Sequence, residues 1–370
     1  MKLKLKPLDR QTLVITGASS GIGLMTARMA AKRGASLVLA ARNKDGLIQL
    51  TEEIQRQGGN AEPIQADVGR EEDIGAIVKI AQDRFGGFDT WINNAGVSTY
   101  GGLLDVTMED HRHLFETNFW GLVYGSLAAA RHLRTRGGAI INIGSTLSDR
   151  AVPLQGMYSA SKHAVKGFTD ALRMELEDED APVSVTLIKP GAIDTPYTSH
   201  AKNYLPMRPK NPPPVYAPEI VAETILHCSE HPVRDMFVGS GGKMTSMMGQ
   251  YAPRLTDKIM EWLFIPAQET QRPEQDRMTN SLYESSGAMK ERGGYQGHVA
   301  ESSVYTQASR HPVLTGAALA GAAFALATWW CDSHNGGRRS ESGRYASRNT
   351  APLYSRRNDI GRRRLRGCGG

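Results

Sequence analysis

The 370-residue sequence predicts an α/β protein built on a doubly wound parallel β-sheet flanked by helices, with a C-terminal helical or disordered extension. Three observations support this prediction. Short runs rich in β-branched residues alternate with longer helix-forming stretches, a glycine-rich turn joins the first run to the first helix, and small or polar residues follow several of the runs. Open α/β sheets bind ligands beyond the carboxyl ends of their strands, so the third observation also indicates where a site would lie.

The first strand is expected at residues 12–16, a continuous apolar run of the kind that is buried on both faces of a sheet. It leads into a turn with the spacing G-x-x-x-G-x-G and then into helix-forming residues. Such a turn lets the backbone approach a pyrophosphate, and the free N–H groups of the helix N-terminus would bind it. The predicted phosphate-binding residues are Gly17, Ser19, Ser20, Gly21, Ile22 and Gly23.

The second strand, expected at residues 36–42, ends in Arg42. A site selective for NAD would place an acidic residue here to bind the ribose 2′-hydroxyl. An arginine suits a 2′-phosphate instead, because its planar fork of donors matches phosphate geometry. The residue therefore predicts NADP(H) as cofactor, and the alternative is a solvated arginine at a strand end.

Further strands are expected near residues 61–66, 90–93, 139–143, 183–188 and 236–239, with helices between them. Asp67, just after the third strand, could accept a hydrogen bond from an adenine amino group or could cap the next helix. Residues that end or follow these strands form the rest of the predicted cofactor site: Asp67, Val68, Asn93, Ala95, Gly96, Pro190, Gly191, Ile193 and Thr195.

Tyr158 and Lys162 lie four positions apart in a helix expected over residues 154–177, so they project from one face. A free phenol titrates near pH 10, and a fixed cation beside it lowers that pKa, which turns a tyrosine into a usable general acid or base. An ordinary amphipathic helix would also place a tyrosine and a lysine in this way. The pair needs support from the rest of the chain.

Six motifs in order supply that support: TGASSGIG (16–23), NNAG (93–96), ETNFWG, INIGST, YSASK (158–162) and PGAIDT (190–195). Together they resemble the short-chain dehydrogenase/reductase family, of the classical type, over roughly residues 10–245. The resemblance implies a Rossmann-like sheet, a small-molecule carbonyl or alcohol substrate, and a homo-oligomer.

The same resemblance assigns roles to four residues. It implies that Tyr158 donates and accepts the proton, and that Lys162 lowers the pKa of Tyr158 and binds the nicotinamide ribose. It also implies that Ser145 hydrogen-bonds the substrate oxygen and that Asn118 supports a water-linked proton relay to Lys162. Arg42 resembles the NADP-using branch of the family.

Hydride transfer is the chemistry of the nicotinamide, so the protein must supply orientation and a proton. We therefore expect an NADP(H)-dependent oxidoreductase. The alternative is a cofactor-binding regulator or redox sensor on the same fold, which usually lacks part of the four-residue set. Residues 197–216 would be a substrate lid by resemblance; Tyr204 and Met207 in it indicate an apolar ligand, although a structural loop fits equally well.

Composition limits the other classes of function. The three cysteines form no zinc or disulfide pattern, the histidines, His200 among them, have no metal spacing, and residues 1–7 lack the apolar run of a secretory signal, so a cytoplasmic catalytic domain without a metal is expected. The whole chain has a net charge of +6. Residues 331–370 carry +7, so residues 1–330 carry −1, and the basic character belongs to the tail. No sequence-specific nucleic-acid binding is expected, although the tail could meet an acidic partner.

Beyond a catalytic domain of residues 1–245, we expect helices over 246–265 that cover it, broken near Pro253, then a polar extended or disordered linker over 266–312 and a disordered arginine-rich tail over 331–370. A chain ended near residue 265 would then remain active.

Residues 313–330 are uncharged and, as a helix, would extend about 27 Å, just short of the ~30 Å hydrocarbon core of a bilayer. They predict a membrane contact, helped by the basic tail, on the cytoplasmic face. A single span would send the positive tail outward, against the positive-inside rule, so an interfacial helix and a helix packed against protein are the alternatives.

Overall fold

The computed structural model describes residues 3–274, 280–285, 287 and 289–339. It divides the chain into two compact units, Met1–His311 and Pro312–Gly370. The first unit contains the sheet and every residue predicted to bind or react.

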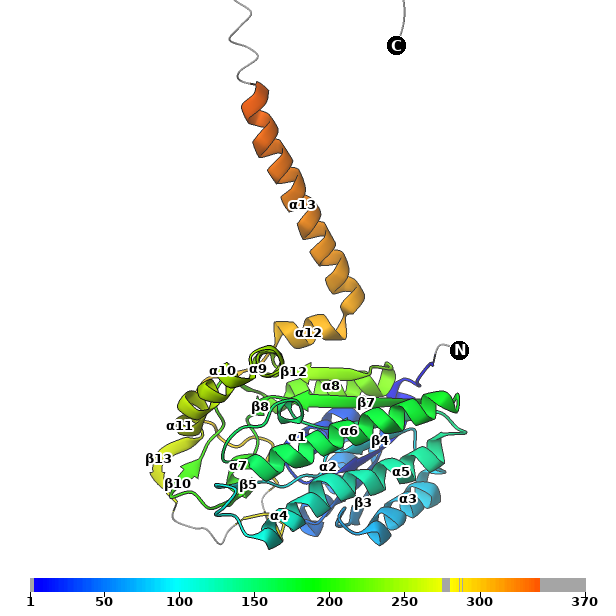
Figure 1. The fold of residues 1–370 in the computed structure, drawn as a ribbon. Coiled ribbons are helices and arrows are strands. Elements are labelled where there is room, and N and C mark those ends of the chain that lie inside the picture. The colour runs from blue at the N-terminus through cyan, green and yellow to red at the C-terminus, as the bar shows by residue number, and fades with distance from the viewer. Residues whose placement is uncertain (1–2, 275–279, 286, 288, 340–370) are drawn as a thin grey trace, which may run out of the picture. The chain divides into compact units, whose positions relative to one another are not determined.

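A seven-stranded parallel sheet forms the centre of the first unit, in the order β12-β7-β6-β4-β1-β2-β3 (Figure 1). This confirms the predicted fold class. The order reverses between β1 and β4, which opens a crevice at the carboxyl ends of these two strands. The bounds of the strands are β1 (Thr12–Thr16), β2 (Ser36–Ala41), β3 (Asn60–Gln65), β4 (Thr90–Asn93), β6 (Gly138–Ile143), β7 (Val183–Pro190) and β12 (Asp235–Val238).

Helices cover both faces of the sheet because side chains alternate between the faces along each strand. In β1, Leu13 and Ile15 pack with α1 (Gly21–Lys32), α2 (Lys44–Arg56) and α8 (Pro218–Glu230). Val14 points the other way and packs with α3 (Glu71–Phe85), α5 (Gly121–Leu133) and α6 (Gly156–Asp178). All three strand side chains are fully buried, so β1 has the two-faced core that its apolar run predicts.

Small strands join the loops at the carboxyl edge. They are β5 (Thr99–Tyr100) with β9 (Lys202–Asn203); β8 (Ala192–Ile193), β11 (Val215–Tyr216) and β14 (Val299–Ala300); and β10 (Met207–Pro209) with β13 (Glu269–Pro273). The remaining helices are α4 (Met108–Phe115), the π-helical turn η2 (Glu116–Trp120), α7 (Tyr197–His200), α9 (Ser240–Tyr251), α10 (Pro253–Ile259), the π-helical turn η4 (Met260–Phe264), α11 (Ile265–Ala267) and α12 (Val304–Arg310).

The prediction that residues 266–312 form an extended or disordered linker is wrong, because residues up to His311 belong to the first compact unit. Strands β13 and β14 pair with β10 and β11, and Leu282 and Gln268 are fully buried. The segment has few large apolar residues, so its composition resembles that of a disordered chain. Backbone hydrogen bonds to residues 207–216 of the lid, together with a few buried side chains, hold the segment in place. The amino-acid composition of the segment does not reveal such bonds.

The second unit contains α13 (Pro312–Arg339), which continues past residue 330, so residues 331–339 of the predicted disordered tail are helical. Residues 340–370 lie outside the described part of the chain. Within the part that is described, no single helix is long and apolar enough to cross a membrane. By length and composition alone, residues 304–310 taken together with 315–330 would meet that requirement as a bent pair.

The unit boundary predicts where the chain can be shortened. A chain ended at His311 should keep the melting temperature of the full protein, because it retains the whole first unit. A chain ended at Ile265 should melt at least about 5 °C lower, since it loses two strand pairings and the buried Leu282 and Gln268. Calorimetry on the three chains measures this difference, and equal melting temperatures would show that residues 266–311 add no stability.

Candidate functional site

Two adjoining cavities lie at the carboxyl edge of the sheet, with volumes of about 200 Å³ and about 510 Å³. The smaller begins at the glycine turn and Arg42, and the larger contains Tyr158 and Lys162. Five residues line both, so the two cavities adjoin, and together they are called the groove. The shared residues are Ile22, Asn94, Gly96, Thr195 and Tyr197.

The glycine turn is held against the end of β4 at very short distances. Gly17 has a φ of +67°, which favours glycine, and a Cβ on Gly23 would lie 2.2 Å from the Gly17 carbonyl oxygen. Asn94 fixes this arrangement, since its side-chain Nδ2 donates to the carbonyl oxygens of Thr16 (2.9 Å) and Gly17 (3.2 Å). The turn therefore leaves its backbone open toward the smaller cavity.

Most of the predicted cofactor residues line the groove. The smaller cavity takes in Gly17, Ser19, Ser20, Gly21, Ile22, Arg42, Asp67, Val68, Ala95, Gly96 and Thr195. The larger takes in Pro190, Gly191 and Ile193 with Tyr158 and Lys162.

Two predicted cofactor residues do not line either cavity. Gly23 is buried behind the turn, and Asn93 belongs to the interior. The amide of Asn93 accepts from Trp91 Nε1 (2.8 Å) and donates to Ser126 Oγ (2.9 Å) and Asn142 Oδ1 (2.8 Å). These bonds join strands and a helix below the groove, and the next residue, Asn94, is the one that reaches it.

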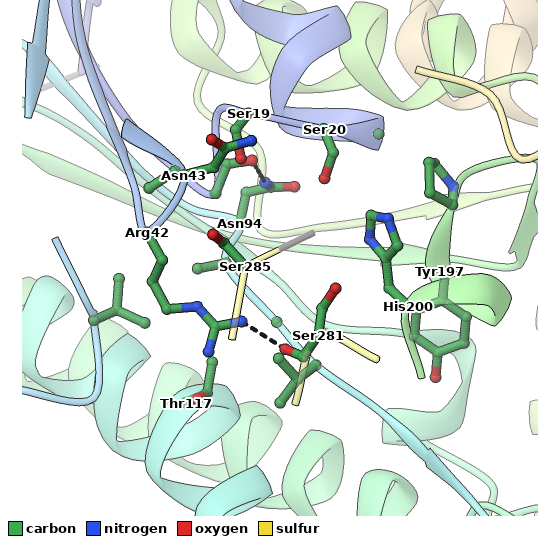
Figure 2. Close-up of a pocket in the computed structure, with 18 of the residues that line it drawn as sticks. Ser19, Ser20, Arg42, Asn43, Asn94, Thr117, Tyr197, His200, Ser281 and Ser285 are labelled. Carbon is green, nitrogen blue, oxygen red and sulfur yellow. Dashed lines mark hydrogen bonds between the residues drawn. The ribbon is translucent and has the colours of Figure 1, made fainter. Parts of the chain in front are cut away.

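Arg42 follows β2 and points into the smaller cavity, but its guanidinium already has partners within the chain (Figure 2). It donates to the main-chain carbonyl oxygens of Ser281 (2.5 Å), Leu282 (3.0 Å) and Tyr283 (3.0 Å). The alternative of a solvated arginine at a strand end is therefore wrong. Burial, opposed by the nearby charge of Asp67, lowers the pKa of Arg42 from its usual value.

Asp67 does not cap α3, whose N-cap is Arg70, and its contact with adenine stays a prediction. Its Oδ1 accepts from the Gly69 backbone N–H at 3.0 Å, which closes a turn before α3, and its side chain lines the smaller cavity. The carboxylate thus orders the loop and remains at the groove.

Three polar side chains gather in the larger cavity. Tyr158 and Ser145 both line this cavity, and the Tyr158 ring lies against that of Tyr197, with centroids 5.5 Å apart. Ser145 begins a 3₁₀ turn, where its Oγ accepts from the Leu147 N–H at 3.1 Å. An accepting Oγ keeps its own proton available, so Ser145 can donate to an oxygen placed beside Tyr158.

Lys162 is buried below Tyr158. Its Nζ donates to the Ile143 carbonyl oxygen at 2.8 Å and lies 5.6 Å from the centroid of the Tyr158 ring. Burial lowers the pKa of Lys162 to about 8. Burial also raises the pKa of Tyr158 to about 12, and the neighbouring polar groups of Tyr197 and Ser145 offset only part of this. The net shift of the Tyr158 pKa is therefore opposite to the one expected from the lysine, because both groups lose water together.

Asn118 lies in the π-helical turn η2, between α4 and α5, and is 1% exposed. Its side-chain amide pairs with the backbone of Val97, accepting at 2.8 Å and donating at 2.9 Å, and it reaches Ser161 Oγ at 3.4 Å. The amide therefore fixes the chain after β4 rather than contacting Lys162. A π-turn displaces backbone carbonyls from their helical partners, and such turns occur often at functional sites.

Sequence reasoning missed a buried hydrogen-bond chain beside Tyr158. Tyr197 donates to Gln155 Oε1 (2.9 Å), and Gln155 Nε2 donates to Gln268 Oε1 (2.7 Å). Gln155 and Tyr197 flank motifs that the sequence already marks, so their positions gave a signal. Gln268 gave none, because it lies in the stretch predicted to be a linker.

Two polar atoms at the smaller cavity have no hydrogen-bond partner among the described residues. They are Thr117 Oγ1 and Ser281 Oγ, both buried. Buried hydroxyls usually find a partner, so their place in the wall suits a ligand with polar groups. Together with the open glycine turn, they make the residues present a fit for a dinucleotide.

The rest of the larger cavity is mostly apolar. Its aliphatic, aromatic and thioether side chains come from β6, the loop that precedes α6, and the helices after β12. They give the Tyr158 hydroxyl a mostly apolar environment. These residues are Ile143, Leu147, Val152, Ile193, Met244, Met248, Ile259, Met260, Leu263 and Phe264. The lid contributes residues 211–214, whereas Tyr204 hydrogen-bonds Asp110 away from the cavity.

Comparisons with known proteins agree on one family. The family model described as short chain dehydrogenase matches residues 11–204. An uncharacterized oxidoreductase, YxnA of Bacillus subtilis, is 50% identical over 323 residues, covering 86% of this chain and 91% of that protein. The versicolorin reductase of Emericella nidulans is 33% identical over 54% of this chain and 75% of its own.

A solved structure extends this likeness to the fold. The alcohol dehydrogenase of Thermococcus sibiricus, complexed with 5-hydroxy-NADP, superposes with a TM-score of 0.55 at 27% identity, covering 62% of this chain and 95% of its own.

The packing of the glycine turn gives a testable prediction. Gly23→Ala should lower the melting temperature by several degrees, because the new methyl group meets backbone at 2.2 Å. Gly75→Ala is the matched control: Gly75 is also helical, and a Cβ there meets nothing within 4 Å, so this change should leave the protein as stable or stabilise it slightly. Thermal unfolding of both variants measures the contrast, and equal effects would contradict the close packing.

Proposed function

This chain belongs to the short-chain dehydrogenase/reductase family, and we propose that it interconverts a carbonyl compound and an alcohol by hydride transfer with NADP(H). The observation that supports this most directly is the groove itself. Two adjoining cavities place a phosphate-binding turn next to a partly buried tyrosine and a buried lysine and serine. A dinucleotide laid along it would bring its nicotinamide end to Tyr158.

NADP(H), when bound, supplies or accepts the hydride, and the protein supplies the proton and the orientation. During reduction negative charge grows on the carbonyl oxygen, and Ser145 and Tyr158 are placed to donate to it as it forms. Tyr158 then gives up its proton to that oxygen. In alcohol oxidation the same oxygen of Tyr158 takes the proton back.

Lys162 is proposed to stabilise the tyrosinate left after proton transfer. Its ammonium is buried and the described residues place no carboxylate against it, so its charge is poorly compensated before the reaction. A negative charge on Tyr158 improves that balance, which favours proton transfer toward the substrate oxygen. Asn118 is proposed to fix the position of the chain after β4 and in this way to support a water-linked proton relay to Lys162.

NADP(H) is proposed over NAD(H) because Arg42 is the residue after β2, where an acid would repel a 2′-phosphate. The Thermococcus sibiricus neighbour with bound 5-hydroxy-NADP is consistent with this choice. The apolar lining of the larger cavity supports a substrate of mainly hydrocarbon character that carries one ketone or alcohol group.

Substitution of the proton donor tests the proposal. Tyr158→Phe should lower kcat by about 100-fold or more while NADPH affinity stays close to that of the wild type, because only the ionisable oxygen is removed. Absorbance of NADPH in a carbonyl screen and calorimetric binding measure the two quantities. Tyr251→Phe is the control, since Tyr251 is 78% exposed and lies outside the groove lining. A non-catalytic regulator would show no turnover to lose.

The buried phenol predicts how activity depends on pH. Because burial raises the pKa of Tyr158, the protonated acid predominates at neutral pH, so the rate of carbonyl reduction should vary little there. Alcohol oxidation needs the deprotonated form, so its kcat/KM should rise with pH from about pH 7 and then level off near pH 8, where Lys162 loses the charge that stabilises the tyrosinate. Initial rates in both directions measure this, and a flat oxidation profile would assign the proton to another group.

A further inference from the structure

The segment Ser281–Glu284 lies across the smaller cavity and is bound through its backbone. Arg42 Nη2 donates to the carbonyl oxygen of Ser281 at 2.5 Å, and Nη1 donates to those of Leu282 and Tyr283 at 3.0 Å each. A weaker contact reaches the carbonyl of Glu284 at 3.4 Å. The guanidinium fork predicted to hold a 2′-phosphate is thus engaged by main-chain dipoles of the same chain.

The opposite side of the segment is anchored independently of Arg42. Tyr283 stacks on His113, with ring centroids 4.3 Å apart, and its hydroxyl donates to Asp110 Oδ1 at 2.6 Å. The Ser281 N–H donates to the His200 carbonyl at 2.7 Å. The segment therefore has a second attachment on α4 and α7 that would persist if Arg42 released it.

The segment is also a wall of the cofactor groove. Ser281 lines the smaller cavity, and its buried hydroxyl has no partner among the residues that the structure describes. Leu282 is fully buried in a cluster that includes Val97 and the partly buried Tyr158. A displacement of this segment would thus change the packing both at the smaller cavity and beside Tyr158.

Carbonyl oxygens and a phosphate compete for the same donors on Arg42. A phosphate carries a full charge and pairs with a guanidinium through two parallel bonds, so it binds more strongly than neutral carbonyls do. We propose that Ser281–Glu284 determines cofactor specificity: a cofactor with a 2′-phosphate must displace the segment from Arg42, whereas one with a free 2′-hydroxyl leaves it in place. This rests on the proposed function, to which it adds the competing ligand of Arg42.

Hydrogen–deuterium exchange on the full-length protein tests the competition. The probes are 2′,5′-ADP, which carries the 2′-phosphate, and AMP, which lacks it, with NADPH and NADH as the complete pair. Saturating 2′,5′-ADP or NADPH should speed exchange of the Leu282 amide by about tenfold, because the charge-assisted bonds that hold the segment are lost, whereas the Ser281 amide stays bonded to the His200 carbonyl and should change little. AMP and NADH should leave exchange at Leu282 unchanged or slow it.

Variants separate Arg42 from a general effect of binding. Arg42→Ala should exchange fast in this segment without any ligand and respond no further to 2′,5′-ADP. Arg56→Ala is the control, because Arg56 is exposed on the neighbouring helix and bonds only within it among the described contacts. Tyr283→Phe, which loses the bond to Asp110, should bind 2′,5′-ADP more tightly while AMP affinity stays the same, since the competitor is weakened.

Calorimetry on the same samples distinguishes the two claims. If 2′,5′-ADP binds and exchange at Leu282 is unchanged or slower, the competition is wrong and the NADP(H) proposal stands. If the protein turns over NADH and binds neither NADPH nor 2′,5′-ADP, the choice of NADP(H) is wrong, and the displacement fails with it.

Discussion

The pairing of β1 with both β2 and β4 determines where the groove lies. Both pairings are parallel, so the glycine turn after β1, Arg42 after β2 and Asn94 after β4 emerge at one edge of the sheet. The short contacts of Gly23 and Asn94 with the Gly17 carbonyl then fix the turn against its neighbour. Without that register the polar ends of three strands would not face one cavity.

Burial dominates the electrostatics at the other end of the groove. The cavity around Tyr158 is mostly apolar, and this withdraws water from the phenol and from the Lys162 ammonium together. A lysine at 5.6 Å from the ring centroid does not overcome that loss of water alone. Lys162 therefore stabilises the tyrosinate of Tyr158 most when proton transfer has just formed it. The pair is suited to a negative charge that develops during the reaction rather than to one present beforehand.

The sheet and most of the groove follow from local sequence signals, because buried strands, glycine turns and polar strand ends each have a short-range pattern. Arg42 shows where such reasoning stops. Its position after β2 predicts a phosphate ligand, but its partners in the structure are carbonyls more than 230 residues away. Main-chain acceptors have no residue signature, so no local pattern predicts them. Asn93 shows a smaller version of the same limit, because a motif fixes its position and the helix packing below decides which neighbour reaches the groove.

The C-terminal extension also orders the protons beside Tyr158. Gln268 Nε2 lies 3.0 Å from the Pro153 carbonyl and 3.2 Å from that of Phe264, and carbonyls only accept, so the Oε1 of Gln268 must be the acceptor from Gln155. The Oε1 of Gln155 in turn accepts the proton of Tyr197. Since a phenol has one proton, the bond between Tyr197 and Ser98 Oγ (2.7 Å) must then use the hydroxyl proton of Ser98. Gln268, which follows the last strand of the sheet by about 30 residues, thereby sets the direction of a hydrogen-bond chain that ends beside the proposed proton donor, since the Tyr197 ring contacts that of Tyr158.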